Sequence, residues 1–214
     1  MRPSSHDERL TVEKVHPDGY MLLNGHHRWA AGLRVGFKWM PVSIVNLTQE
    51  TDIEKMLQAS THNRRVTLDL DEVIFCKDGM PAEKTLPFPY RSLYREPIRL
   101  GVPALLHFLS MRGYDIWVYT AELYSLEYIR EYFRRYSAKV DGIITGTGRK
   151  AGSREDAQKR VRELFTARYG ETLHIDSHSV VRIFRDGRDF EEYAIPDDAS
   201  RWSKQVMDIL KRCR

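Results

Sequence analysis

Hydrophobic positions in the larger part of the chain alternate between short continuous runs and stripes with helical spacing. From residue 66 onward, four short apolar runs predict strands at 66–70, 116–119, 140–144 and 173–175. The segments between them repeat apolar residues three and four positions apart, which predicts helices at 101–112, at 122–136 and from Ser153 to Gly170. Strands that alternate with amphipathic helices predict a Rossmann-like parallel α/β sheet. Two further runs, 180–184 and 193–195, and a helix over about 200–210 are expected to close this domain.

Residues 10–47 have a different pattern, which predicts strands at 11–15, 20–23 and 41–45 with a short helix over 26–35 that ends at Gly36. Residues 50–59 place Ile53, Met56 and Leu57 on one helical face. We therefore expect three parts: a small α+β module in residues 1–48, a linking helix within 49–65, and an α/β domain over 66–214.

The composition is typical of a globular protein. Of 214 residues, 42% are hydrophobic and 30% are charged, which excludes a disordered tail or a collagen-like fibre. The longest apolar-leaning stretch, about 100–111, is shorter than the roughly 20 residues of a membrane span, and no secretory signal opens the sequence. The two cysteines, Cys76 and Cys213, lack metal or redox spacing, which favours a reduced, cytoplasmic protein. The net charge of +4 is mixed along the chain, so it permits a nucleic-acid partner without requiring one.

Polar residues that could take part in catalysis or ligand binding follow the predicted parallel strands. Asp69 and Asp71 end the first strand, Thr120 ends the second and Asp176 ends the fourth, while Lys150 precedes the helix that starts at Ser153. Ligands of such sheets bind beyond the carboxyl ends of the strands, so these residues are expected at one edge. Together they could hold Mg²⁺ and a phosphate. The structural alternative is that the acids only end a strand and cap a turn.

Residues 65–214 resemble the haloacid dehalogenase superfamily. The segment Val66-Thr67-Leu68-Asp69-Leu70-Asp71-Glu72-Val73 is similar to its first motif, an apolar strand followed by Asp-x-Asp. The other three motifs correspond to Thr120 after Ile116-Trp117-Val118-Tyr119, to Lys150, and to Asp176 in His174-Ile175-Asp176. The order of these motifs is specific as a set, although each motif alone is weak.

This resemblance implies a role for each matched residue. Asp69 would be the nucleophile that forms an aspartyl-phosphate, and Asp71 would be the general acid and then the base for water. Thr120 and Lys150 would bind the phosphoryl oxygens, with Lys159 as the competing lysine. Asp69, Asp176 and the main-chain carbonyl of Asp71 would hold Mg²⁺.

Two departures from the family pattern bear on the activity. Ser177-His178-Ser179 follows Asp176 where many members carry a second acid, so a serine or water would complete the metal shell. Neither residues 76–100 nor residues 144–150 are long enough to fold as a cap domain. The resemblance is thus to a capless member with an open cleft, which accepts large substrates.

The segment Leu22-Leu23-Asn24-Gly25-His26-His27-Arg28-Trp29-Ala30-Ala31 resembles the phosphate-binding motif of the ParB/sulfiredoxin superfamily. In that superfamily a Gly-x-x-Arg turn opens a helix and binds ATP or CTP, and some members are kinases. The resemblance implies that Gly25, His26, His27 and Arg28 bind a nucleotide; the alternative is that the module is only a scaffold.

Three hypotheses follow from the sequence. The first is a Mg²⁺-dependent phosphomonoesterase that acts on phosphorylated nucleotides, other phosphorylated small molecules or nucleic-acid ends. The second is a bifunctional kinase–phosphatase in which the amino-terminal module uses a nucleotide to transfer phosphate. The third is a non-catalytic nucleotide- or DNA-binding regulator whose second domain is inactive, a reading that Ser177 suggests.

Overall fold

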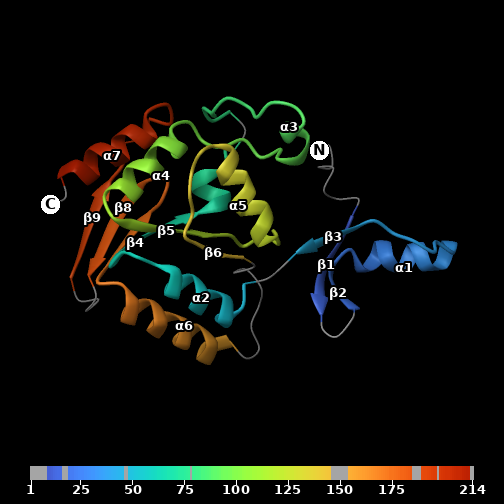
Figure 1. Cartoon of the computed structure of the whole chain (residues 1–214). Helices are drawn as coiled ribbons and strands as arrows, with labels where there is room; N and C mark the ends of the chain where they lie inside the picture. The colour runs from blue at the N-terminus through green and yellow to red at the C-terminus, as the bar shows by residue number, and fades with distance from the viewer. Residues whose placement is uncertain are drawn as a thin grey trace.

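The chain forms two β-sheets, a smaller one with the single helix α1 and a larger one with helices on both faces, as the computed structural model in Figure 1 shows. The structure describes residues 9–15, 19–45, 48–77, 79–145, 154–184, 189–196 and 198–212. The smaller sheet has the strand order β2-β1-β3, and the larger has the order β6-β5-β4-β7-β8-β9. The predicted α/β class with a mostly parallel, Rossmann-like sheet is therefore confirmed at this level.

The smaller sheet lies in the amino-terminal part of the chain. Its elements are β1 (Leu10–Val15), β2 (Gly19–Asn24), α1 (His26–Val35) and β3 (Val42–Val45). β1 pairs antiparallel with β2 and parallel with β3, so α1 connects the two outer strands. The helix begins after Gly25 (φ 93°) and ends at Gly36 (φ 83°). Both positions need the left-handed backbone that glycine adopts without strain.

Four strands of the larger sheet are parallel: β4 (Arg64–Asp69), β5 (Tyr114–Tyr119), β6 (Gly142–Ile144) and β7 (Glu171–Ile175). From β4 the chain passes to β5 and β6 on one side, and then returns to β7 on the other side of β4. The winding direction therefore reverses between β4 and β7. In open α/β sheets this switch point is where ligands bind.

The other two strands, β8 (Ser179–Phe184) and β9 (Phe190–Ala194), are antiparallel to their neighbours. Only residues 176–178 separate β7 from β8. A parallel partner would need a crossover of a dozen or more residues, so this connection permits only a hairpin. The expected parallel sheet thus has an antiparallel edge.

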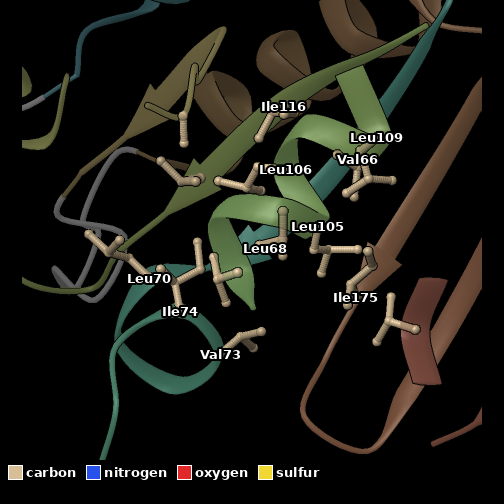
Figure 2. Packing of buried hydrophobic residues seen from close by; sticks show 14 of the residues in the cluster. Val66, Leu68, Leu70, Val73, Ile74, Leu105, Leu106, Leu109, Ile116 and Ile175 are labelled. Carbon is tan, nitrogen blue, oxygen red and sulfur yellow. The ribbon is translucent and has the colours of Figure 1, made fainter. Parts of the chain in front are cut away.

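Helices cover both faces of the larger sheet. In Figure 1, α4 (Val102–Met111), α5 (Leu126–Arg135) and α7 (Trp202–Arg212) lie on one face, and α2 (Glu50–Ala59) and α6 (Arg154–Arg168) lie on the other. Figure 2 shows Leu105, Leu106 and Leu109 of α4 packed near Val66 and Leu68 of β4. Each of these buried side chains contributes about 1.5–3 kcal/mol by leaving water. This packing holds the central strand in place.

Residues 50–59, which the sequence predicts as a linking helix, form α2 and pack against the large sheet. Ile53, Met56 and Leu57 share a core cluster with Trp117 of β5 and Phe165 of α6. Before α2, the hydroxyl of Thr48 donates to the carbonyl of Ile143 at 3.0 Å. The helix thus belongs to the second helical layer as well as joining the two sheets.

The helix predicted over 122–136 begins four residues later than expected. Ser125 caps α5 by accepting a 3.0 Å hydrogen bond from the Tyr128 amide. Residues 122–125 are therefore an irregular segment between β5 and α5. A short helix, α3 (Tyr90–Leu93), lies in the proline-rich segment before α4. No helix in the described ranges is both long and apolar enough to cross a membrane.

Candidate active site

The structure brings the carboxyl ends of β4, β5 and β7 together at one edge of the large sheet. In the parallel register, Asp69 is paired with Tyr119, the residue before Thr120. Leu68 is paired with Ile175, so Asp69 and Asp176 occupy the next positions of adjacent strands. The switch point between β4 and β7 therefore carries two acids, with Thr120 one strand away.

Asp69 is oriented by the turn that follows it. Residues Leu70–Ile74 form a π-helical turn, and Oδ1 of Asp69 accepts hydrogen bonds from the amides of Asp71 and Glu72, both at 2.8 Å. Both contacts use the same oxygen. Among the described residues Oδ2 of Asp69 accepts no hydrogen bond, which makes it the carboxylate oxygen that can reach a ligand.

Asp71 contacts the end of the neighbouring strand. Its Oδ2 accepts a 2.6 Å hydrogen bond from the hydroxyl of Thr120 and one of 3.2 Å from the amide of Ala121. Burial raises the pKa of Asp71 above its usual value, and the nearby charge of Asp69 raises it further. The hydrogen bond from Thr120 acts in the opposite direction. A carboxyl group whose protonated form is favoured is suited to donating a proton.

Thr120 is fully buried and uses its hydroxyl hydrogen for Asp71. The same hydroxyl accepts the amide of Glu122 at 3.0 Å. The sequence predicts this residue as a phosphoryl ligand, whereas in the structure its hydroxyl connects Asp71 to the segment before α5. Because Thr120 holds Asp71, it also determines where that carboxyl group points.

The segment after Asp176 connects to the turn after Asp69. The amide of Ser177 donates to Oδ1 of Asp176 at 2.6 Å, and its hydroxyl donates to the carbonyl of Glu72 at 3.2 Å. The indole of Trp202 donates to the carbonyl of Ser177 at 2.9 Å. Ser177 thus joins the two acid-bearing segments. From the sequence alone, Ser177 was notable only because it stands where many members of the resembled family carry a second acid.

The donor set that the sequence predicts for Mg²⁺ consists of the carboxylates of Asp69 and Asp176 and the main-chain carbonyl of Asp71. All are hard oxygen donors, which fit Mg²⁺ by type. Within the ranges that the structure describes, no cluster of three or more His, Cys, Asp or Glu side chains is arranged as a metal site. A metal here would therefore depend on the carbonyl and on water as well as on the two acids.

The two candidate lysines are not brought to this edge. Lys150 lies outside the described residues. Lys159 is exposed on α6, and within the described part of the chain it forms no hydrogen bond or ion pair with Asp69 or Asp71. The cation that would offset the charge of a phosphoryl group is thus not identified among the described residues.

The predicted nucleotide-binding residues lie at the start of α1. Gly25 has the left-handed backbone and precedes the free amides of the first helical turn. The Nη1 atom of Arg28 is buried and has no hydrogen-bond partner, while its Nη2 lies close to Gly25. His26 and His27 are exposed. Gly25 and Arg28 therefore lie close together at the start of α1.

A hollow of about 440 Å³ lies between this module and the segment around the start of α5. Asn24, Arg28 and Ile44 line it from the module, and Glu122, Tyr124 and Tyr128 are among the residues that line it from the other side. The rings of Tyr124 and Tyr128 are stacked, with centroids 5.7 Å apart. Glu122 also donates its amide to Thr120, so the wall of the hollow adjoins the acid-bearing edge.

Arg28 is a predicted site residue, whereas Glu122, Tyr124 and Tyr128 were not predicted from the sequence. The sequence signal for the two tyrosines is their spacing of four positions. The same spacing is typical of the buried face of a helix, so it does not indicate a binding site.

Comparison of the chain with models of protein families, with curated proteins and with solved structures found no match.

Proposed function

We propose that the large α/β domain is a Mg²⁺-dependent phosphomonoester hydrolase of the haloacid dehalogenase type. The observation that carries this proposal is the position of Asp69 and Asp176 on adjacent strand ends with Asp71 hydrogen-bonded to Thr120. Two acids at a switch point, beside a third with a raised pKa, supply a nucleophile, a metal-binding group and a proton donor.

Asp69 and Asp71 divide the chemistry between them. Oδ2 of Asp69 attacks the phosphorus, the bond to the leaving oxygen breaks, and protonated Asp71 transfers its proton to that oxygen. Water then attacks the phosphorus of the aspartyl-phosphate while Asp71 accepts its proton, which releases phosphate and restores the Asp69 carboxylate. When bound, Mg²⁺ would offset the negative charge of the phosphoryl group.

The substrate class follows from the hollow beside the site. The stacked pair Tyr124 and Tyr128 offers an aromatic surface that suits a nucleobase, and Arg28 on the opposite wall suits a phosphate. We infer that the substrates are phosphorylated nucleotides or nucleic-acid ends.

The test is hydrolysis of p-nitrophenyl phosphate with Mg²⁺ by the full chain and by Asp69→Asn. We expect Asp69→Asn to lower kcat by roughly 10³-fold or more, since the nucleophile is lost. Asp208→Asn, which changes an acid on α7, is the matched control and should remain active. An inactive full chain between pH 5 and 8 would contradict the proposal and favour the non-catalytic regulator. A screen of nucleotides and of DNA and RNA with 3′- or 5′-phosphate ends would then identify the substrate.

The second candidate is a bifunctional kinase–phosphatase. The observation in its favour is the buried Nη1 of Arg28, which lacks a partner beside the left-handed Gly25 at the start of α1. A helix start and an arginine suit the phosphates of ATP or CTP. Transfer of radiolabel from either nucleotide that is lost in Arg28→Ala would support this function, and no transfer from any nucleotide would reject it.

A further inference from the structure

Arg99 is a buried cation whose side chain has two donor nitrogens without a hydrogen-bond partner. Its side chain lies between the turn after β4 and α7, and only 3% of the residue is exposed. Nε and Nη1 contact neither solvent nor any hydrogen-bond acceptor. The guanidinium stacks over the ring of Trp202, 4.1 Å from its centroid. No carboxylate in the described ranges forms an ion pair with it.

This arrangement is unusual because a guanidinium carries five N–H donors. Buried polar groups are normally satisfied, and a buried charge without acceptors is costly. Stacking on Trp202 offsets part of that cost but supplies no acceptor. Burial lowers the pKa of Arg99, yet an arginine remains charged at neutral pH. The guanidinium of Arg99 therefore lacks a negatively charged hydrogen-bond acceptor.

Arg99 lines a pocket of about 190 Å³ that can hold such an acceptor. Lys77, an exposed cation, and His178 also line this pocket. Its volume is suited to a small anion rather than to a nucleotide. A guanidinium binds phosphate and carboxylate oxygens in a bidentate manner, while an ammonium group adds a second charge.

Two acids also line the pocket, and neither neutralises Arg99. Oδ1 of Asp198 accepts hydrogen bonds from the amide and hydroxyl of Ser200, and Oδ2 lies 3.9 Å from Nε of Arg201. Its carboxylate is thus already engaged in the turn before α7. Glu72 is exposed and offers an acceptor for an anion that carries a proton, such as hydrogen phosphate.

We propose that this pocket is a binding site for a small phosphate-class oxyanion, with Arg99 as its buried cation and Lys77 at its outer side. The site is separate from the edge formed by Asp69, Asp71 and Thr120. It adjoins that edge, because Ser177 lines the pocket and its neighbour Asp176 faces the switch point. The proposal does not depend on the proposed hydrolase activity.

The test is isothermal titration calorimetry of the full chain with inorganic phosphate, in EDTA and at constant ionic strength. Asp69→Asn serves as the background in which the proposed catalytic site cannot turn over. In this background we expect Arg99→Met to weaken phosphate binding at least tenfold and Lys77→Gln to weaken it less. Methionine keeps the apolar packing against Trp202 without the charge. Lys38→Gln, which changes an exposed lysine of the amino-terminal module, is the matched control and should bind as the parent does.

A second readout observes Arg99 directly. In ¹⁵N-labelled protein, the Nε–H resonance that disappears in Arg99→Met should shift when phosphate is added. Because Lys77 is exposed, we expect Lys77→Gln to fold. This variant keeps the test decisive if Arg99→Met fails to fold. The proposal is overturned if phosphate does not bind, or if it binds equally well to the parent and to both pocket variants.

Two sources of the anion are distinguished by comparing a nucleoside monophosphate with a nucleoside bisphosphate. If Arg99→Met weakens binding of the bisphosphate as well as that of inorganic phosphate, the pocket takes a second phosphoryl group of a substrate. If it weakens binding of inorganic phosphate and of neither nucleotide, the pocket takes the free anion.

Discussion

The hydroxyl of Thr120 donates a 2.6 Å hydrogen bond to Oδ2 of Asp71, although the two residues lie 49 positions apart in the sequence. They follow adjacent parallel strands, β5 and β4, whose register places Tyr119 opposite Asp69. This bond orients the proposed general acid and opposes the rise in its pKa.

Thr120→Val should therefore change the pH dependence of catalysis. Without the hydroxyl, the charged form of Asp71 loses a donor, so its pKa rises further and the corresponding limb of the pH–kcat profile moves to higher pH. The fold should lose about 1 kcal/mol of stability, since one buried hydrogen bond disappears. Thr120→Ser keeps the hydroxyl and should keep the parent profile. Identical profiles for the valine and serine variants would contradict the assignment of Asp71.

Asp71→Asn should stabilise the fold at neutral pH. Because the folded-state pKa of Asp71 lies above the unfolded value near 3.8, the parent loses stability as pH rises from that value through the folded pKa. The uncharged amide of the variant removes this loss. In EDTA, the Tm of Asp71→Asn should therefore exceed that of the parent at pH 7, and the two Tm values should be equal near pH 3. Asp208, whose pKa is lowered mainly by Lys211, provides the opposite case. Asp208→Asn should show no rise at pH 7, and a rise as large as that of Asp71→Asn would refute this explanation.

Asp176→Asn should weaken Mg²⁺ binding without destabilising the fold. Asp176 supplies one of the two carboxylates in the proposed donor set, so its loss should raise the Mg²⁺ concentration for half-maximal activity about tenfold or more. The measurement is a Mg²⁺ titration of p-nitrophenyl phosphate hydrolysis, with Asp208→Asn as control. An unchanged half-maximal concentration would remove Asp176 from the metal site.

Arg182→Met should destabilise the edge of the large sheet. Arg182 donates to both carboxylate oxygens of Glu171, at 2.9 and 3.1 Å, and Glu171 also accepts the hydroxyl of Tyr114 at 2.6 Å. Glu171 is buried, so loss of its cation should cost about 3–5 kcal/mol in denaturant unfolding. Replacing both Arg182 and Glu171 with methionine should recover most of the loss. Lys211→Met, at an exposed pair, should have little effect.

Much of the secondary structure could be predicted because hydrophobic spacing records which face of an element is buried. The stripe Leu105, Leu106 and Leu109 predicts α4, and the helix over residues 50–59 has the predicted bounds. Apolar spacing predicts the start of α5 four residues too early, because Ser125 caps the helix and apolar spacing does not report a cap.

The sequence by itself determined the alternation of strands and helices and the polar residues at the carboxyl ends of β4, β5 and β7, because both depend on local spacing. Only the tertiary structure decided which strands are neighbours, and so that Asp69 lies between Thr120 and Asp176. It also decided that Ser177 joins the two acid-bearing segments and that Arg99 is buried on Trp202 without an acceptor. These relationships join residues tens of positions apart, and burial and hydrogen bonding between them arise only when the sheet assembles.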